Sequence, residues 1–210
     1  IGKYGSCTGS FADKRAYLAV YKLWRHIAHD KYDRGRHTLK YIYEKSGGCL
    51  ILKLILAGGG TGGHLFPAIA LAQEFKERDK TCNILFIGSK KGLEAKILSR
   101  YGFELNALDV EGIKRKGLLD KLASLFKAGI AIWKCRNIIK MFKPDFVIGT
   151  GGYSAFPAVM AARIMKIKTA ILEQNALPGA ANKFLGRFVD RVFVAFPEVW
   201  QKALSILKDF

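Results

Sequence analysis

The stretch "LILAGGGTGGHLFPA", residues 54–68, places five glycines and one histidine between a short apolar run and a proline. The apolar run at 52–57 is typical of a buried strand, because it is short and consists mostly of aliphatic residues. A segment with helical periodicity follows at 66–78, and Pro67 suits the first turn of a helix, where its missing N–H costs nothing. The stretch therefore predicts a strand, a glycine-rich loop and a helix in direct succession.

The glycines of this loop follow the spacing G-x-G-x-x-G at Gly58, Gly60 and Gly63. Glycine permits a tight turn and a close approach of the backbone to a ligand, and the following helix offers free N–H groups at its N-terminus. The loop is therefore suited to bind an anion or a polar sugar-phosphate. It is not a P-loop, because no Gly-Lys-Ser/Thr sequence follows, and the spacing alone does not identify one ligand.

Short apolar runs alternate with helical segments from residue 51 to the C-terminus. The predicted strands are 52–57, 83–87, 104–108, 145–148, 168–172 and 190–195. The predicted helices are 66–78, 91–101, 118–142, 155–166, 179–187 and 197–208. This alternation predicts an α/β fold over residues 51–210, a doubly wound, Rossmann-like parallel sheet with helices on both faces. Ligands of such folds bind beyond the carboxyl ends of the strands.

A second glycine loop closely repeats the first. The sequence "GTGGYSAFPAVMAA" at 149–162 matches "GTGGHLFPAIALA" at 60–72 in Gly-Thr-Gly-Gly, in a ring at the next position and in Phe-Pro-Ala, with one residue added. Two such loops, each at a strand end and each opening a helix, are placed to line one crevice from both sides. A dinucleotide-binding fold needs only the first loop, and the simpler alternative is that both are tight turns.

A third polar segment, "LEQNALPGAANK" at 172–183, follows the fifth predicted strand. Glu173, Gln174 and Asn175 are expected at the carboxyl end of that strand, and Asn182 on the next helix. Four polar side chains in this place are suited to hydrogen-bond a sugar or a peptide. The alternative is a loop that caps its own helix.

An NADP-binding module is the alternative function. A dinucleotide-binding fold has an acidic residue at the end of its second strand, where it holds the ribose. Here the second strand ends in "GSKKG" at 88–92, without a carboxylate. The two lysines of this stretch suit the 2′-phosphate of NADP instead, so this alternative stays open.

The three segments, in this order, resemble the MurG family of peptidoglycan glycosyltransferases, from about Leu52 to the C-terminus. The resemblance implies the N-terminal, acceptor-binding domain of a GT-B type hexosyltransferase that uses no cofactor. It implies transfer of N-acetylglucosamine from UDP-N-acetylglucosamine to lipid I, the undecaprenyl-linked acceptor, to form lipid II. The family's donor-binding domain is expected to begin about where this chain stops, so we expect no turnover by the chain alone.

The resemblance also implies which residues bind substrate. The glycine loops at 58–63 and 149–152 are expected to face the diphosphate of the acceptor. His64 is the candidate base for the acceptor's C4 hydroxyl, or it holds the diphosphate, or it caps its helix. The family usually has histidine where this chain has Leu172. The expected substrate-binding residues are Gly58, Gly60, Thr61, Gly62, Gly63, His64, Gly151, Gly152, Tyr153, Glu173, Asn175 and Asn182.

The chain of 210 residues is strongly basic, with 35 Lys and Arg residues against 17 Asp and Glu residues and a net charge of +18. Such a charge predicts an anionic partner, and without a recognised nucleic-acid-binding motif we expect no nucleic acid among the partners. No metal site is expected, because the cysteines form no CxxC pair and His26 and His29 have no third ligand in view. Residues 1–50 are a basic extension that does not resemble the family and stays unassigned.

The segment 111–143 predicts a surface that faces a membrane. It has nine basic and two acidic residues, and Leu119, Phe126 and Trp133 recur at helical spacing beside Lys127. One apolar stripe is expected to pack on the sheet, and this one to dip into an anionic interface. The alternative is a buried amphipathic helix with a solvated rim. Together with the resemblance, this surface predicts a peripheral protein at the cytoplasmic face of the cell membrane.

Overall fold

The computed structural model describes residues 51–90, 94–108 and 118–195, and in the last range it describes side chains from residue 126 onward. The predictions that lie outside the described residues concern residues 1–50, the pair His26 and His29, the helix at 197–208 and the side chain of Leu119.

In the described residues, six parallel strands form one sheet in the order β3-β2-β1-β4-β5-β6. The strands are β1 (Lys53–Gly58), β2 (Asn83–Ser89), β3 (Glu104–Leu108), β4 (Phe146–Gly151), β5 (Lys168–Glu173) and β6 (Arg191–Val194). The strand order runs outward in both directions from the neighbouring pair β1 and β4. The predicted doubly wound sheet is therefore confirmed, and the switch point, where such folds bind ligands, lies between β1 and β4.

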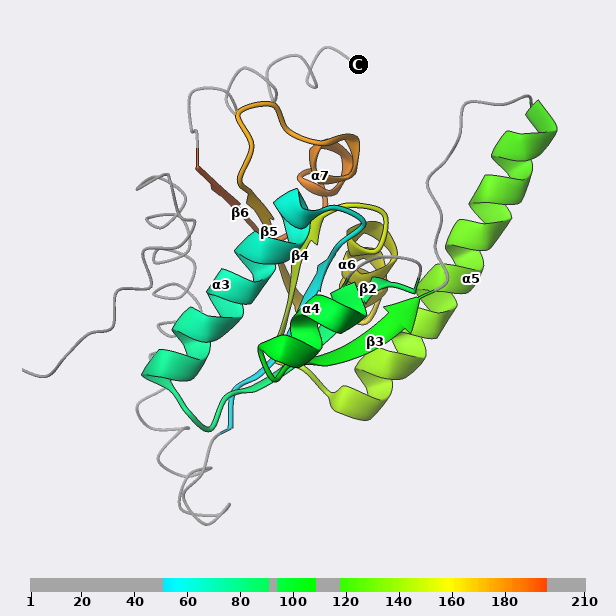
Figure 1. Cartoon of the computed structure of the whole chain (residues 1–210). Helices are drawn as coiled ribbons and strands as arrows, with labels where there is room; N and C mark the ends of the chain where they lie inside the picture. The colour runs from blue at the N-terminus through cyan, green and yellow to red at the C-terminus, as the bar shows by residue number, and fades with distance from the viewer. Residues whose placement is uncertain (1–50, 91–93, 109–117, 196–210) are drawn as a thin grey trace, which may run out of the picture.

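Helices cover both faces of this sheet (Figure 1). They are α3 (Gly62–Arg78), α4 (Glu94–Arg100), α5 (Leu118–Phe142), α6 (Ala155–Ile164) and α7 (Ala180–Leu185). Helices α3 and α4 contribute to the core on one face, and α5, α6 and α7 to the core on the other. The predicted α/β layering is therefore confirmed.

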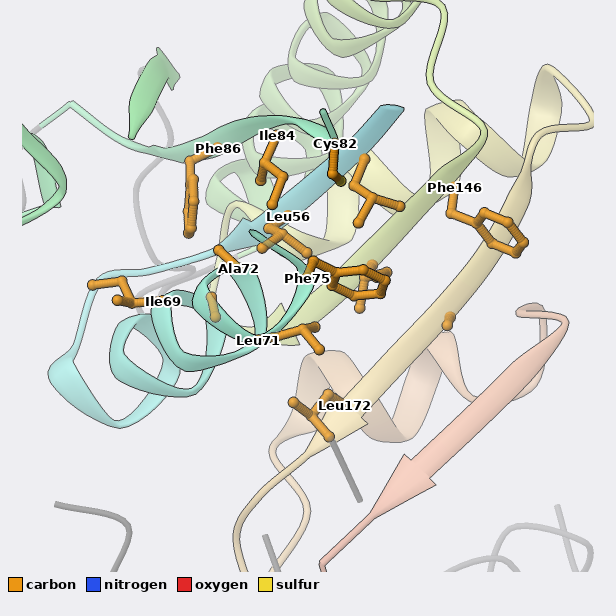
Figure 2. Packing of buried hydrophobic residues seen from close by; sticks show 14 of the residues in the cluster. Leu56, Ile69, Leu71, Ala72, Phe75, Cys82, Ile84, Phe86, Phe146 and Leu172 are labelled. Atoms are coloured by element: carbon orange, nitrogen blue, oxygen red, sulfur yellow. The ribbon is translucent and has the colours of Figure 1, made fainter. Parts of the chain in front are cut away.

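The two cores are built from alternate residues of the same strands. Figure 2 shows one of them, in which Leu56 of β1 and Phe75 of α3 are both fully buried. The opposite core contains Ile55 of β1 and Val159 of α6. Because successive strand residues point to opposite faces, a strand that is buried on both faces must be a continuous apolar run, as at 52–57.

Two aspartates align neighbouring strands at the amino edge of the sheet. Asp145, directly before β4, accepts a hydrogen bond from the backbone N–H of Lys53 in β1, with N and Oδ2 2.8 Å apart. Asp190, directly before β6, accepts in the same way from the N–H of Thr169 in β5, also at 2.8 Å. These bonds help to set the strand register, and β1 and β4 consequently end side by side at the carboxyl edge.

The start of α3 differs from the sequence prediction. The periodicity predicts a helix from residue 66, and the structure begins it at Gly62. Apolar periodicity does not detect this first turn, because Gly62, Gly63 and His64 carry no apolar side chain. Pro67 therefore lies in the second turn, and its predicted place in the first turn is wrong. Its missing N–H leaves the carbonyl group of Gly63 without its usual helical partner.

The end of β4 also differs. The prediction ends this strand at residue 148, and the structure continues it to Gly151. The second Gly-Thr-Gly therefore belongs to the strand itself. Glycine is a weak strand former, so the apolar pattern ends before the paired backbone does.

Candidate functional site

The two glycine loops touch each other at the switch point of the sheet. Gly152 has φ +82°, and a Cβ atom there would collide with the carbonyl oxygen of Gly59. Gly151 has φ +107°, and a Cβ atom there would lie 2.6 Å from Nδ1 of His64. Both positions require glycine, because the loops meet without room for a side chain and in a backbone conformation that other residues rarely adopt.

His64 joins the two loops through its backbone and its ring. The hydroxyl group of Thr150, near the end of β4, donates to the carbonyl oxygen of His64 across 2.9 Å. The ring nitrogen Nδ1 lies 3.0 Å from the carbonyl oxygen of Thr150. The residue is partly exposed, and Nε2 has no hydrogen-bond partner in the described part of the chain. One ring nitrogen therefore contacts the end of β4, and the residue keeps part of its surface exposed.

Gln174 brings the third polar segment to the first glycine loop. Its Nε2 donates to the carbonyl oxygen of Gly63 across 2.9 Å and lies 2.9 Å from Nδ1 of His64. The Gly63 carbonyl is open to this bond because Pro67, four residues later, has no N–H. The sequence indicates Gln174 only as one of four polar residues at a strand end. It does not indicate this contact between residues 110 positions apart.

The other polar residues of the third segment bind one another. Glu173 is 1% exposed, and its Oε1 accepts from the backbone and side-chain nitrogens of Asn175, both at 3.0 Å. Its Oε2 accepts from Nδ2 of Asn182 at 2.9 Å and from the N–H of Gly179 at 3.1 Å. Glu173 and Asn182 thus organise the loop before α7 from inside, while Asn175 is exposed.

A buried acid beside the first glycine loop is a residue that sequence reasoning missed. Glu94 begins α4 and is 2% exposed. Its Oε1 accepts a hydrogen bond from the N–H of Gly60, and its buried Oε2 has no hydrogen-bond partner in the described residues. The available signal is an acidic residue in the first turn of a predicted helix, where it meets the positive end of the helix dipole.

Glu94 changes what the first loop can bind. In a dinucleotide-binding fold, the N–H groups of this loop face the pyrophosphate. Here the N–H of Gly60 is already bonded to a carboxylate, and a phosphate group beside it would meet a second negative charge. The contact therefore argues against the NADP alternative, and it limits a bound diphosphate to the rest of the loop.

Several of the predicted substrate-binding residues lie on the surface at this edge of the sheet. Tyr153 is 59% exposed, and Thr61, before the first residue of α3, makes no capping hydrogen bond with its side chain. The exposed members of the predicted set are Gly60, Thr61, Gly62, Gly63, Tyr153 and Asn175. By contrast, Gly58 and Gly151 are buried in the two strand ends.

Potential metal ligands are dispersed in the described structure. Within residues 51–90, 94–108 and 118–195, no three His, Cys, Asp or Glu side chains gather in a way that could hold a metal ion. Cys82 and Cys135 are both buried free thiols. Desolvation by burial raises the pKa of Cys135 to about 12, so this thiol is an inert core residue.

Helix α5 has one buried and one exposed apolar stripe. Cys135 and Ile139 are fully buried in the core shared with α6. Phe126 and Trp133 are 73% and 60% exposed, and Lys127 is exposed beside them. The predicted outward stripe is confirmed at these positions, and its contact with a membrane stays a prediction. Among the helices in the described ranges, none combines the length and the apolar character needed to cross a bilayer.

A protein-family model matches the part of the chain that forms the switch point. The family model described as the glycosyltransferase family 28 N-terminal domain matches residues 54–194. This chain belongs to glycosyltransferase family 28. The matched range begins in β1, ends with β6 and contains both glycine loops and the third polar segment.

Two curated relatives are about 50% identical to this chain over the region that they share with it. The protein of Syntrophus aciditrophicus (strain SB) is 51% identical over 149 residues, covering 71% of this chain and 41% of the relative. The protein of Thermoanaerobacter sp. (strain X514) is 51% identical over 147 residues, covering 70% and 40%. Both are named UDP-N-acetylglucosamine--N-acetylmuramyl-(pentapeptide) pyrophosphoryl-undecaprenol N-acetylglucosamine transferase.

A solved structure has a similar fold over the matched part. The crystal structure of MurG from Acinetobacter baumannii is 34% identical, with a TM-score of 0.61, and the match covers 70% of this chain and 42% of that one. The chain therefore spans about two fifths of the length of these relatives. These comparisons give the NADP alternative no support.

Proposed function

We propose that this chain is the acceptor-binding, N-terminal part of an enzyme that transfers N-acetylglucosamine from UDP-N-acetylglucosamine to lipid I and forms lipid II. Its relatives at 51% identity carry the name of this transferase. The supporting observation in the structure is the meeting of three segments at the switch point. His64 of the first glycine loop lies against Thr150 of the second and Gln174 of the third polar segment.

The proposed reaction is a displacement at the anomeric carbon of the transferred sugar. The C4 hydroxyl group of the acceptor attacks, a base takes its proton, and UDP leaves. His64 is a candidate for this base and also for a hydrogen-bond donor to the acceptor's diphosphate, since it is partly exposed and its Nε2 has no hydrogen-bond partner among the described residues. Positive groups that stabilise the leaving UDP belong, in this proposal, to the donor side.

The acceptor is proposed to bind at the carboxyl edge of β1, β4 and β5. Exposed groups of Thr61, Tyr153 and Asn175 are available there, together with backbone N–H groups of the glycine loops. Glu173 and Asn182 support this surface from inside, through the hydrogen bonds that organise the loop before α7. Transfer also requires the donor to be held in near-attack geometry. We propose that the donor site lies in the part of the relatives' length that this chain does not cover.

Isothermal titration calorimetry of the 210-residue chain tests this division of labour. A soluble lipid I analogue that retains the diphosphate is expected to bind, and UDP-N-acetylglucosamine is expected to bind weakly or not at all. Micromolar binding of UDP-N-acetylglucosamine would show that the donor site lies in this chain and that the proposed location of the site is wrong. Binding of NADPH, detected by its fluorescence, would instead support the dinucleotide alternative.

A chimaera tests the activity itself. The described domain is joined to the remaining C-terminal part of the Syntrophus aciditrophicus relative, and conversion of the lipid I analogue is followed. Turnover by the chimaera together with none by the 210-residue chain is the expected result. A well-folded chimaera that binds both substrates and converts none would contradict the proposed transferase role.

We further propose that the exposed stripe of α5 holds the protein at the cytoplasmic face of the membrane. Phe126 and Trp133 supply apolar area, and Lys127 supplies positive charge beside it. In liposome flotation, binding to anionic vesicles is expected to exceed binding to neutral ones and to fall in a Phe126→Ser, Trp133→Ser variant. Tyr101→Ser is the matched control, because Tyr101 is 44% exposed and follows α4 on the other face of the sheet. Equal loss in both variants would contradict the assignment.

A further inference from the structure

We propose that Gln174 is a positioning residue that sets the tautomer of His64. By donating a hydrogen bond to Nδ1, it keeps the ring proton on Nε2, so that His64 presents an N–H group to a ligand. The identity of that ligand, the diphosphate of the acceptor, rests on the proposed function. The tautomer itself follows from the hydrogen bonds within this chain.

The orientation of the Gln174 amide is determined by the first glycine loop. One end of the amide lies 2.9 Å from the carbonyl oxygen of Gly63, and because a carbonyl group can only accept, that end must be the nitrogen. The Gly63 carbonyl takes this partner because Pro67 cannot supply the helical N–H. The proline thereby determines which end of the amide faces Nδ1 of His64.

Nδ1 of His64 has two neighbours, one of which can form a hydrogen bond only with a protonated Nδ1 and the other only with an unprotonated Nδ1. The carbonyl oxygen of Thr150, 3.0 Å away, can only accept a hydrogen bond. The amide nitrogen of Gln174, 2.9 Å away, can only donate one. A neutral imidazole can satisfy one of the two, so these neighbours decide where the ring proton lies.

Each tautomer leaves one neighbour of Nδ1 without its hydrogen bond, and the cost is larger when that neighbour is Gln174. If Nδ1 carried the proton, its N–H would face an N–H of Gln174, and that N–H of the amide would lose its partner. The buried Oε1 of Gln174 already has no hydrogen-bond partner among the described residues. If Nδ1 accepts instead, both hydrogens of the amide are used, one by Gly63 and one by His64. With the proton on Nε2, the carbonyl group of fully buried Thr150 faces the lone pair of Nδ1 instead. A backbone carbonyl has a second lone pair with which to accept, whereas an N–H of the amide has no other use and the amide already has an unpaired Oε1, so we place the proton on Nε2.

This tautomer separates the two roles left open for His64. A neutral ring with its proton on Nε2 has no lone pair there to take a proton from a hydroxyl group. It has instead an N–H group that suits a phosphate oxygen. The geometry around Gln174 therefore assigns His64 to holding the acceptor's diphosphate.

Long-range ¹H–¹⁵N correlation spectra of the ¹⁵N-labelled 210-residue chain test the inference, since ring ¹⁵N shifts separate protonated from unprotonated nitrogens. Spectra are recorded where the ring shifts no longer change with rising pH, and a His64→Gln variant identifies the signals among those of the four histidines. The expected pattern is an unprotonated Nδ1 and a protonated Nε2. In Gln174→Met, the pattern is expected to reverse, because the Thr150 carbonyl then remains as the neighbour of Nδ1. Gln73→Met, at an exposed position of α3, is the matched control and is expected to change nothing.

A protonated Nδ1 in the unchanged chain would overturn the inference, and so would an unaltered pattern in Gln174→Met. Gln174→Glu keeps the shape of the side chain and can only accept, so it is expected to give the same reversal if the methionine variant does not fold. None of these measurements depends on turnover. Loss of acceptor binding with the expected tautomer would therefore count against the proposed function and leave the role of Gln174 intact.

Discussion

The same four residues, Gly-Thr-Gly-Gly, have different structures at 60–63 and at 149–152. The first copy forms the loop after β1 and the first turn of α3, and the second copy forms the end of β4 and one residue beyond it. In the sheet, Gly151 pairs with Gly58, although the sequences align it with Gly62. The two copies of the repeat therefore form different structural elements, which contact each other at the carboxyl edge of the sheet.

The threonines of the two copies show the consequence. Thr150 is fully buried, and its hydroxyl group donates to the carbonyl oxygen of His64. Thr61 is exposed and makes no capping hydrogen bond with its side chain. Identical residues thus have a structural role in one copy and are exposed in the other, because backbone pairing with β1 and β5 draws the second copy into the sheet.

The largest expected effect separates the glycines of the two copies. Gly152→Ala is expected to lower the free energy of unfolding by about 3 kcal/mol or more, because it combines a positive φ with a backbone collision against Gly59. Gly60→Ala has a similar φ of +84° and open space, so about 1–2 kcal/mol is expected. Urea denaturation of the 210-residue chain measures both. Equal losses would mean that the close approach of the loops is not what requires glycine at 152.

The rings that follow the two copies are expected to differ in importance for turnover. In the chimaera, His64→Ala is expected to lower kcat/KM by about 10- to 100-fold, since this ring is held by two segments and a hydrogen bond to a charged group contributes about 1.5–3 kcal/mol. Tyr153→Ala is expected to cost about tenfold or less, because its ring is 59% exposed and it supplies contact area. A His64→Ala enzyme within about twofold of the parent would leave His64 without a role in the reaction.

Glu94 is expected to weaken anion binding at the Gly60 end of the first copy. Glu94→Gln keeps an oxygen for the N–H of Gly60 and removes the charge, so inorganic pyrophosphate is expected to bind about tenfold more tightly at low salt. Glu77→Gln, at an exposed position of α3, makes the same change in net charge and is the control. Calorimetry with both variants decides whether the effect is local. Equal tightening would assign it to net charge alone.

The smallest effect compares the threonines directly. Thr150→Val removes the hydroxyl bond to His64 and is expected to lower the free energy of unfolding by about 1 kcal/mol. Thr61→Val removes no such bond, and a change within about 0.5 kcal/mol is expected. Thermal denaturation monitored by circular dichroism measures the difference. A larger loss for Thr61→Val would reverse the assignment of structural and exposed roles.

Most of the fold could be predicted from the sequence, because it depends on local patterns. Continuous apolar runs predict strands that are buried on both faces, and the observed strands overlap every predicted one in the described residues. The 25-residue helix α5 coincides with its predicted range. The predicted start of α3 and the predicted end of β4 are wrong, because glycines stand there in place of apolar residues and hydrophobic periodicity gives no signal at Gly62 and Gly151.

The candidate site was predictable in its residues and less so in its contacts. The glycine loops predict His64 at the edge of the sheet, and the structure places it there. Glu94 was missed, because a single acid in a helical segment resembles an ordinary exposed residue until β1 and β2 are placed side by side. Gln174 was indicated by its position, and its bonds to Gly63 and His64 were not.

By itself, the sequence determined the kind and succession of the elements, the edge of the sheet that carries the polar segments and the resemblance to a glycosyltransferase family, because each of these depends on residues close together in the chain. Only the tertiary structure decided the strand order around β1 and β4. That order brings Thr150 and Gln174 to His64 and Glu94 to Gly60, across separations of 86, 110 and 34 positions. Such hydrogen bonds depend on atoms being within about 3 Å of each other, and no local pattern encodes that distance.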